Sequence, residues 1–319
     1  MRTMKEKKNI QIGGQAVIEG VMMRGPEYYA TAVRRKNHQI EIKKEKFHSI
    51  TKQNRFLGLP VIRGFVSLIE MLIIGIKSLN FSASRAELDF EDPKKEKKAS
   101  NSGNKFSEYL SFVLAFGLAF LLFAYLPYQI ADWLKLSKEN IYFNLFAGMI
   151  RIIFFVVYIW IISRFKEIRR VFQYHGAEHK SVYAYENDID LSPIKIQEFS
   201  TLHPRCGTSF IFLVLLISIA LFSIVDTIVS RIWGTPGILT RLAYHMLMIP
   251  FISGISYEIL KLSGKNINHP LVKMLTAPGL ALQRITTQPP DDDQIEVAVI
   301  AMKCALEIDL ENNDNLKFI

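Results

Sequence analysis

Cysteine is scarce in this chain, and its scarcity excludes a fold held together by disulfides. Two cysteines, Cys206 and Cys304, occur among 319 residues. They lie far apart in different sequence contexts, so they give no disulfide framework and fit a reducing compartment. The segment from Met1 to Gln11 is basic and lacks the apolar core of a secretory signal peptide. We therefore expect no cleaved leader.

A basic module interleaved with aromatic residues is also missing, which argues against nucleic acid as a partner. The net charge is nevertheless +9, and half of the residues are hydrophobic. An excess of Lys and Arg in cytoplasmic loops is the ordinary pattern of bilayer proteins. We expect the lipid bilayer as a partner and no nucleic acid.

What the chain does have is four apolar stretches long enough to cross a hydrocarbon core, which takes about 20 residues. Lys and Arg concentrate before the first stretch and after the second, and few occur in the two intervening turns. The positive-inside rule then predicts a multi-pass protein of the cell membrane, with both termini and residues 164–207 in the cytoplasm. The stretches run near Ser107–Ala131, Tyr142–Ser163, Thr208–Val229 and Ile238–Leu260.

A fifth apolar stretch, Leu59–Phe81, differs from these four. Its charged residues Arg63, Glu70 and Lys77 recur every seven residues and so fall on one helical stripe. The segments before and after it are both basic, although a spanning helix would place them on opposite sides of the membrane. An interfacial or re-entrant helix avoids that conflict.

These observations predict a mainly α fold: a polytopic membrane protein with a four-helix transmembrane bundle and a small cytosolic β-containing N-terminal region. Within that region, the alternating segments Thr31–Arg35 and Gln39–Lys43 predict a hairpin. The expected organisation is a β-containing region over 1–57, an interfacial or re-entrant helix over 58–82, a charged linker over 83–105, four transmembrane helices over 106–263 with the cytosolic loop 164–207, and a cytosolic helical tail over 264–319.

Two local pairings are expected elsewhere. In the tail, Asp293 followed three residues later by Glu296 predicts a helix cap. The helix after it would carry one apolar stripe, made of Ile295, Val299, Met302 and Leu306. Within the spans, charges need partners, and Arg151 is expected to pair with Asp226.

The polar segment between the second and third stretches carries His175-Gly176-Ala177-Glu178-His179. If Tyr174–Lys180 is helical, His175 and His179 lie one turn apart and can reach one divalent metal ion, with zinc the first expectation. Glu178 could ligate or act as general base. The pattern H-x-x-E-H is the inverted form of the zinc-protease signature. The alternative is that the histidines lie among headgroups while Glu178 pairs with Lys180 or Arg170.

A second motif, His203-Pro204-Arg205-Cys206-Gly207, enters the third stretch. Either His203 or Cys206 could be the third metal ligand. At a helix N-terminus, Arg205 could also hold a phosphate or carboxylate. The alternative is that these residues only begin the helix, since Pro204 and Gly207 suit that position.

Further candidates come from two other places. A glycine-rich stretch covers residues 13–26, and in it Glu19 and Arg24 could reach the cytosolic site, although a tight β-turn structure also explains the glycines. Near the cytosolic end of the fourth stretch, Glu258 could be a fourth ligand or a proton relay.

Three segments together carry a resemblance: G-G-Q-A-V-I-E-G-V-M-M-R-G-P at 13–26, H-G-A-E-H-K at 175–180 and H-P-R-C-G-T at 203–208. Their combination resembles the YqhQ-like family of uncharacterised bacterial membrane proteins, for which metal-dependent enzymatic activity is predicted. The resemblance implies a polytopic membrane protein of a Gram-positive-type bacterium. It also implies that His175 and His179, with Glu178 or His203, are metal-site candidates. It names no substrate.

The resulting hypothesis is a metal-dependent hydrolase that acts on a membrane-associated substrate, either a lipid headgroup or a peptide. The alternative is a non-enzymatic membrane scaffold or a small-solute transporter. A transporter would bring polar residues or broken helices together at mid-bilayer. Metal analysis of the purified protein separates a metal site from a scaffold.

Overall fold

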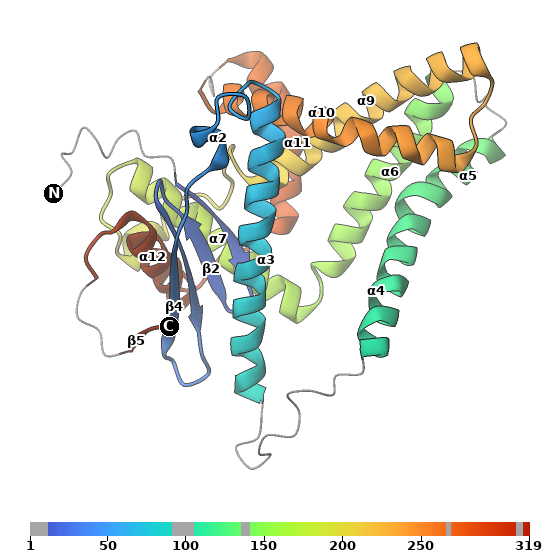
Figure 1. Cartoon of the computed structure of the whole chain (residues 1–319). Coiled ribbons are helices and arrows are strands. Elements are labelled where there is room, and N and C mark those ends of the chain that lie inside the picture. Colours follow the sequence, from blue (N-terminus) through green and yellow to red (C-terminus); the bar gives the residue numbers. More distant parts are fainter. Residues whose placement is uncertain (1–11, 91–104, 135–140, 266–268, 311–314) are drawn as a thin grey trace. The chain divides into compact units, whose positions relative to one another are not determined.

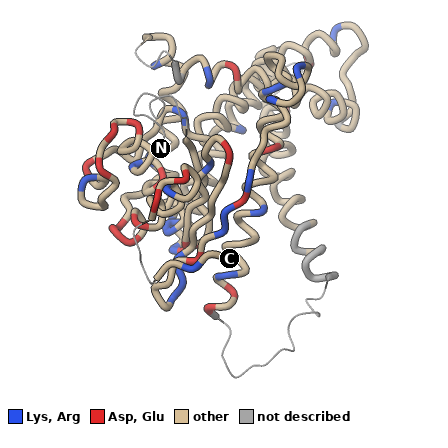
Figure 2. Tube along the Cα trace, turned by 60° about the vertical axis from the view of Figure 1, so that its left-hand side comes forward, with Lys and Arg blue, Asp and Glu red and all other residues tan. Residues whose placement is uncertain are grey.

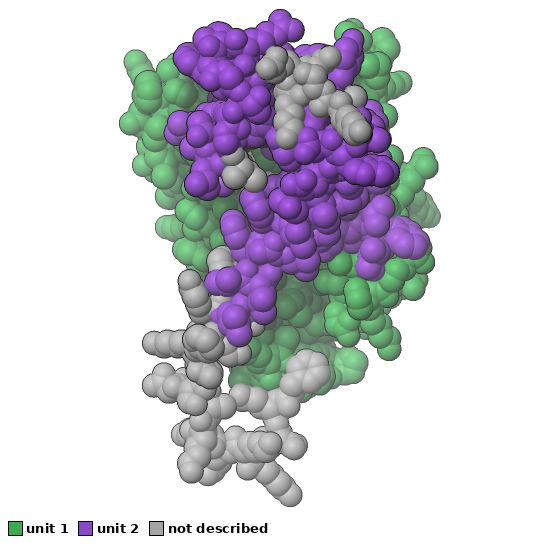
Figure 3. Space-filling model, turned by 90° about the vertical axis from the view of Figure 1, so that its right-hand side faces the viewer, with its two compact units in different colours: residues 1–90, 162–211, 253–319 green, residues 91–161, 212–252 purple. Residues whose placement is uncertain are grey.

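The computed structural model describes residues 12–90, 105–134, 141–265, 269–310 and 315–319. The chain forms two compact units, coloured separately in Figure 3. Figure 2 shows Lys, Arg, Asp and Glu concentrated in the first unit, whereas the long helices of the second carry few of them. Unit 1 comprises Met1–Phe90, Ile162–Ile211 and Ser253–Ile319, and unit 2 comprises Glu91–Ile161 and Phe212–Ile252.

Unit 1 is built on a five-stranded sheet whose strands follow one another in sequence order. The first four strands are antiparallel, and the last pairs parallel to the fourth. The predicted hairpin is confirmed: Arg34 lies opposite Ile40, and His38 in the turn has φ 65°. The last strand, Leu316–Phe318, was not predicted, because the tail was expected to be helical. The strands are β1 (Gly13–Val17), β2 (Gly20–Arg24), β3 (Tyr28–Arg34), β4 (Ile40–Lys46) and β5 (Leu316–Phe318).

Helices cover both faces of this sheet (Figure 1). On one face lies α3 (Ile62–Phe90), where Thr31 Oγ1 donates to Ser78 Oγ at 2.9 Å. On the other lie α7 (Lys166–Glu186) and α12 (Asp292–Leu306). Neighbouring strand residues point to opposite faces, and both sets are apolar because both faces are buried. Val17, Val33 and Phe81 pack on the α3 side, and Val21, Met23, Ala30, Ala32, Ile40 and Ile42 on the α7–α12 side.

Helix α3 confirms a helix at the fifth apolar stretch, but its end was predicted too early. Residues 83–90, assigned to a charged linker, are helical, and the rest of that linker up to residue 104 lies outside the described residues. The predicted charge stripe makes specific contacts. The Glu70 carboxylate accepts from the backbone N–H of Ile50 at 2.7 Å, at the start of α2 (Ile50–Gln53), and Arg63 pairs with Glu258.

All four predicted spanning stretches are helical, and each is long and apolar enough to cross a membrane. The first is interrupted by a π-helical turn, η1, which joins two α-helices. The segments are α4 (Lys105–Phe120) with η1 (Leu121–Tyr125) and α5 (Leu126–Trp133), then α6 (Ile141–Ile162), α9 (Gly207–Trp233) and α10 (Ile238–Lys265).

The polar residues of unit 2 pair differently from the prediction. Arg151 Nε donates to the carbonyl of Phe123 at 2.6 Å, within the π-helical turn that disturbs the regular backbone ladder. Asp226 accepts from the Tyr244 hydroxyl and lies 2.9 Å from His245 Nε2. The expected Arg151–Asp226 ion pair is therefore replaced by a cluster within α9 and α10.

The tail contains α11 (Pro270–Thr286) and α12, and the loop before α9 contains the short α8 (Pro193–Ile196). The predicted cap on α12 is wrong by two residues. Asp291 is the N-cap, and it exchanges side-chain to backbone bonds of 2.8 and 3.0 Å with Gln294. Glu296 instead pairs with Arg34 of the sheet. The predicted apolar stripe of α12 is buried in the main core.

Candidate metal centre

Helix α7 carries the first motif, and the predicted helical turn over Tyr174–Lys180 is confirmed. The rings of His175 and His179 lie on one face, with centroids 4.4 Å apart. Gly176 costs helix stability relative to Ala, yet the position requires it. A Cβ there would stand 2.1 Å from the carbonyl oxygen of Gln288. The glycine allows the chain after α11 to pass directly over the helix.

Cys206 lies against the two histidines. Its Sγ is 3.2 Å from His175 Nε2, and one ligand atom from each of the three residues lies within 4.8 Å of the others. Donors around one tetrahedral zinc are about 3.3–3.8 Å apart, given bonds of about 2.0–2.3 Å. His179 and Cys206 are buried and His175 is half-buried. The cluster therefore has the donor types and nearly the spacing of a metal site.

The second ring nitrogen of each histidine is held by the backbone. His175 Nδ1 lies 2.9 Å from the carbonyl oxygen of Thr286, and His179 Nδ1 contacts the carbonyl of Thr201. A carbonyl only accepts, so both Nδ1 atoms carry the proton and both Nε2 lone pairs are free to bind. This outer bonding is the usual support of metal-ligating histidine.

His179 Nε2 is buried among polar groups. It makes no hydrogen bond of good geometry among the described residues, and its neighbours are the Cys206 thiol and, at 3.5 Å, the Glu178 carboxylate. Burial lowers the pKa of His179, so the ring favours its neutral, ligand-competent form. This nitrogen therefore faces both the thiol and the carboxylate of the cluster.

Glu178 lies beside the cluster on the adjoining face of α7. Its Oε2 is 3.5 Å from His179 Nε2, and its side chain is buried. Burial raises the pKa of Glu178, while nearby His175 and the backbone N–H of Gly14 oppose that rise. Gly14 must be small, since a Cβ there would lie 3.0 Å from Glu178 Cγ and 2.4 Å from the carbonyl of Met22. The glycine-rich strand β1 thus meets the site at Glu178.

His203, the other candidate for third ligand, lies beside the cluster, with its ring centroid 5.7 Å from that of His179, but its nitrogens have other partners. Its Nδ1 accepts from the backbone N–H of Arg205 at 3.3 Å, and its Nε2 lies 3.6 Å from Glu186. Gln283 of α11 fixes this orientation, because its amide bonds both the N–H and the carbonyl of His203, at 2.7 and 2.9 Å. Of the two candidates, the geometry brings Cys206 to the histidines.

Three of the other predicted site residues have partners elsewhere. Arg205 forms an ion pair with Glu186 instead of leaving its guanidinium open to an anion. Arg24 stacks over the Phe47 ring at 4.1 Å, under α3. Glu258 accepts two bonds from Arg63, at 2.6 and 2.5 Å.

Glu19 reaches α7 but not the ligand atoms. It pairs with Arg170 and accepts at 3.4 Å from the hydroxyl of Tyr174, the residue directly before His175. Lys180 donates to the carbonyl of Gln197. Lys180 and Arg170 were the alternative partners predicted for Glu178. Both of them therefore bind other groups.

Sequence reasoning missed three supporting residues. Thr201 and Thr286 act through backbone carbonyls, for which no side-chain pattern exists. Gln283 did leave a signal, since it stands at helical spacing with Gly279, Leu282 and Thr286, the stripe that α11 buries. A polar residue in such a stripe needs partners.

Comparison with known proteins places the chain in a family. Residues 59–308 match the family model described as "Protein of unknown function (DUF1385)". The chain is also 33% identical, over 318 residues, to "Uncharacterized protein YqhQ" of Bacillus subtilis (strain 168), covering 98% of each chain. No solved structure matches it. The resemblance seen in the three motifs is thereby confirmed at the level of the family, and the chain belongs to the DUF1385 family, together with YqhQ.

Proposed function

We propose that His175, His179 and Cys206 hold a divalent metal ion, zinc by preference, and that the protein is a metal-dependent hydrolase acting on a membrane-associated substrate. The observation that carries this proposal is the bonding of both imidazoles. Each Nδ1 faces a backbone carbonyl, so each Nε2 presents its lone pair on the side of Cys206, whose Sγ lies 3.2 Å from His175 Nε2. Four helices of membrane-spanning length support the choice of a membrane-associated substrate.

The donor set favours zinc. One thiolate with two imidazoles suits zinc better than magnesium or calcium, which prefer oxygen. Three protein donors also leave one position of a tetrahedron for a substrate or water, as catalytic sites do. When bound, the ion supplies a Lewis acid that polarises a substrate oxygen and acidifies water.

Glu178 is the residue placed to move a proton. It lies beside His179 Nε2, and the surrounding sheet and helix exclude bulk solvent from it. Its raised pKa brings the carboxyl towards the range in which a group can both take and return a proton. Gly14 holds it in place from strand β1. We assign Glu178 the general-base role and leave ligation to the other three residues.

Metal content tests the ligand set. The full chain, purified in detergent and dialysed against zinc, should hold about one zinc per chain by mass spectrometry. His175→Ala, His179→Ala and Cys206→Ala should each lose most of it. His203→Ala is the matched control, since that ring lies nearby but points to Glu186, and it should keep its zinc. A parent protein without metal, or loss only in the control, contradicts the site and favours a scaffold.

Turnover tests the enzymatic part separately. Zinc-loaded protein is incubated with vesicles of bacterial lipid extract and with a membrane-bound peptide, and released products are identified by mass spectrometry. Glu178→Gln should keep zinc and lower turnover by about 100-fold or more, as expected for loss of a general base. Retained zinc with no turnover of either substrate in the parent protein would reject the hydrolase and keep the metal site.

A second candidate rests on a specific contact, the 3.2 Å separation of His175 Nε2 and Cys206 Sγ. A histidine oriented by a carbonyl and bonded to a thiol is also the arrangement of a cysteine nucleophile. Cys206 directly precedes helix α9, and the backbone N–H of Thr208 in the first turn of that helix donates to its Sγ at 3.4 Å. The two candidates differ at His179: a nucleophile needs His175 alone, whereas a metal site needs both rings. Turnover that survives His179→Ala and chelation would favour the nucleophile.

A further inference from the structure

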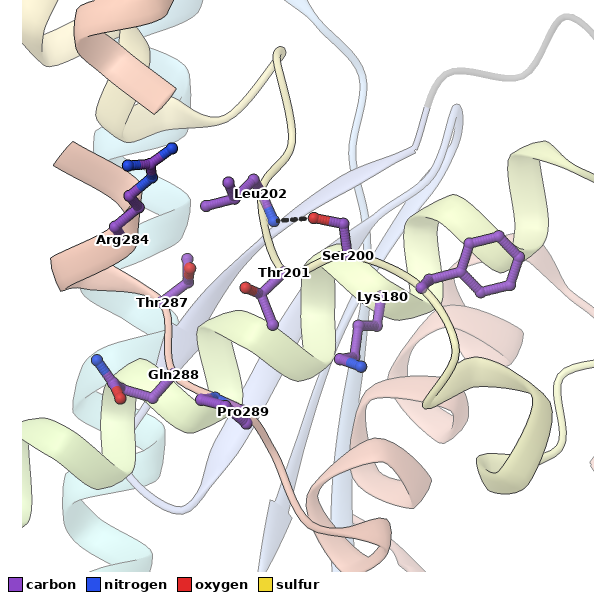
Figure 4. Close-up of a pocket in the computed structure, with 9 residues that line it drawn as sticks. Lys180, Ser200, Thr201, Leu202, Arg284, Thr287, Gln288 and Pro289 are labelled. Atoms are coloured by element: carbon purple, nitrogen blue, oxygen red, sulfur yellow. Dashed lines mark hydrogen bonds between the residues drawn. The ribbon is translucent and has the colours of Figure 1, made fainter. Parts of the chain in front are cut away.

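An open pocket of about 490 Å³ lies in unit 1, lined in part by residues 199–202, and the carbonyl of Thr201 in that segment contacts His179. Its volume lies within the range of small-molecule sites, about 300–1,000 Å³. We propose that this cavity binds a phosphate group, held by Lys180 and Arg284. The proposal concerns a site separate from the metal ligands and does not depend on bound metal. Figure 4 shows the residues that line it: Lys180, Phe199, Ser200, Thr201, Leu202, Arg284, Thr287, Gln288 and Pro289.

The charge of the lining is the first argument. Two of the nine residues are cationic and none is acidic. Lys180 is 7% exposed, and its ammonium donates to the carbonyl of Gln197. Within the described part of the chain, no carboxylate lies within 4 Å of the Lys180 or Arg284 cations. Buried charges are normally paired, so an ammonium with only a carbonyl partner leaves a place for an anion.

The neutral part of the lining suits the same ligand. The Ser200 hydroxyl accepts from the backbone N–H of Leu202 at 3.0 Å, which leaves its own proton free to donate. Thr201 lies between Ser200 and Leu202 and adds a second hydroxyl to the wall (Figure 4). Phosphate oxygens accept several charge-assisted bonds at once, from a lysine as a point charge and from an arginine as a fork. A lining of cations and hydroxyl donors therefore favours phosphate over an apolar ligand.

The walls are fixed before any ligand arrives. The backbone N–H of Gln288 donates to the carbonyl of Phe172 on α7 at 2.9 Å, and Gly176 lets the two segments touch. On the opposite wall, the carbonyl of Thr201 accepts a hydrogen bond from His179 Nδ1. Preformed walls lower the cost of ordering a site upon binding. The cavity is thus part of the rigid frame around α7.

Calorimetry with inorganic phosphate tests the proposal on the full chain. The protein is kept in a sugar-based detergent, which carries no phosphate, and is stripped of metal with a chelator. We expect saturable binding that weakens as salt is raised. Lys180→Gln and Arg284→Gln should each weaken it about tenfold or more, as for the loss of a charge-assisted bond. Lys195→Gln is the matched control, because that exposed lysine pairs with Asp190 outside the cavity, and it should bind as the parent does.

The same measurement distinguishes a soluble phosphate from a lipid headgroup. The protein is placed in lipid discs of pure phosphatidylcholine, or of phosphatidylcholine mixed with phosphatidic acid. If the natural ligand is a lipid headgroup, phosphatidic acid would compete with inorganic phosphate and raise its apparent Kd in the mixed discs. Equal Kd values would identify a soluble phosphate compound. Either result supports the site.

Two outcomes would overturn it: no saturable phosphate binding, or full binding by Arg284→Gln. Arg284 is exposed, so that variant should fold even if Lys180→Gln does not. Zinc content, measured on the same samples before stripping, reports independently on the metal centre. Loss of phosphate binding with zinc retained, or the reverse, shows which proposal fails.

Discussion

At the scale of single residues, the contacts of α7 depend on the absence of a side chain at Gly176. Replacing Gly176 by Ala would place a Cβ 2.1 Å from the carbonyl of Gln288, so helix or loop must shift. Overpacking of this kind costs about 1–3 kcal/mol. We expect Gly176→Ala to lower the melting temperature and the zinc content. Gly117→Ala is the control, because that helical glycine has nothing within 4 Å of the added Cβ, and it should be neutral or slightly stabilising. An unchanged melting temperature for Gly176→Ala would contradict the close approach.

The buried Cys304 should react slowly with thiol reagents. Burial raises the pKa of the Cys304 thiol to about 11, although nearby Lys44 opposes the rise. In the folded protein the Cys304 thiol therefore keeps its proton at pH values well above the pKa of a free cysteine. The stability that the protonated thiol contributes is lost as the pH rises towards 11. We expect Cys304 to react slowly with iodoacetamide at pH 8, and faster by about tenfold for each pH unit up to pH 11. Peptide mass spectrometry of the Cys206→Ala variant measures this rate. Reaction as fast as in the denatured chain would refute it.

The spacing of single residues predicted part of the candidate centre and could not predict the rest. The separation of His175 and His179 by four positions places their rings together on any helix. The choice between His203 and Cys206 depends instead on Gln283, which is 80 positions away in sequence. No local pattern reports such a contact, and so both alternatives remained open until the fold was known.

At the scale of secondary structure, helices α9 and α10 are joined by buried polar contacts. Asp226 accepts from Tyr244 and lies 2.9 Å from His245 Nε2 and 3.5 Å from Arg241 Nε. Removing the charge of the buried Asp226 leaves the half-buried Arg241 without its carboxylate, and breaking a buried ion pair costs up to about 3–5 kcal/mol. We expect Asp226→Asn to be strongly destabilised in thermal unfolding. Asp190→Asn breaks an exposed ion pair with Lys195 and should change stability by less than about 1 kcal/mol. Equal melting temperatures for the two variants would contradict a structural role for the cluster.

Elements with strong periodic patterns were predicted well, and elements defined by distant partners were not. The four apolar stretches are long, so composition alone identified them. Strand β5 has three residues, and its partner β4 lies at the other end of the chain, so its sequence carries no strand signal. The cap of α12 was misplaced because three acidic residues, Asp291, Asp292 and Asp293, follow one another and only the geometry selects the first.

At the scale of the whole molecule, the order of segments along the chain constrains how it can lie in a membrane. Unit 1 gathers residues from 12–90, 162–211 and 253–319. Two helices of membrane-spanning length separate the first segment from the second, and two more separate the second from the third. A pair of spans returns the chain to the side from which it started, so the three segments can fold together only if α3 does not cross. If those four helices cross a membrane, we infer that α3 stays on the side of the sheet it packs against, which agrees with the interfacial or re-entrant helix expected from the basic segments on either side of it.

This inference, together with the positive-inside rule, gives a definite labelling pattern. Single cysteines are introduced at Asn37, Glu198 and Thr235 in a Cys206→Ala, Cys304→Ala background, and intact cells are treated with a membrane-impermeant maleimide. Thr235 lies between α9 and α10, so it should react from outside. Asn37 and Glu198 belong to unit 1 and should react only after permeabilisation. If Asn37 and Glu198 labelled from opposite sides, α3 would have to cross, and a sheet whose first strands lie across the bilayer from α7 could not form. Labelling of both from outside would keep the fold, reverse its orientation and move the metal centre out of the reducing compartment.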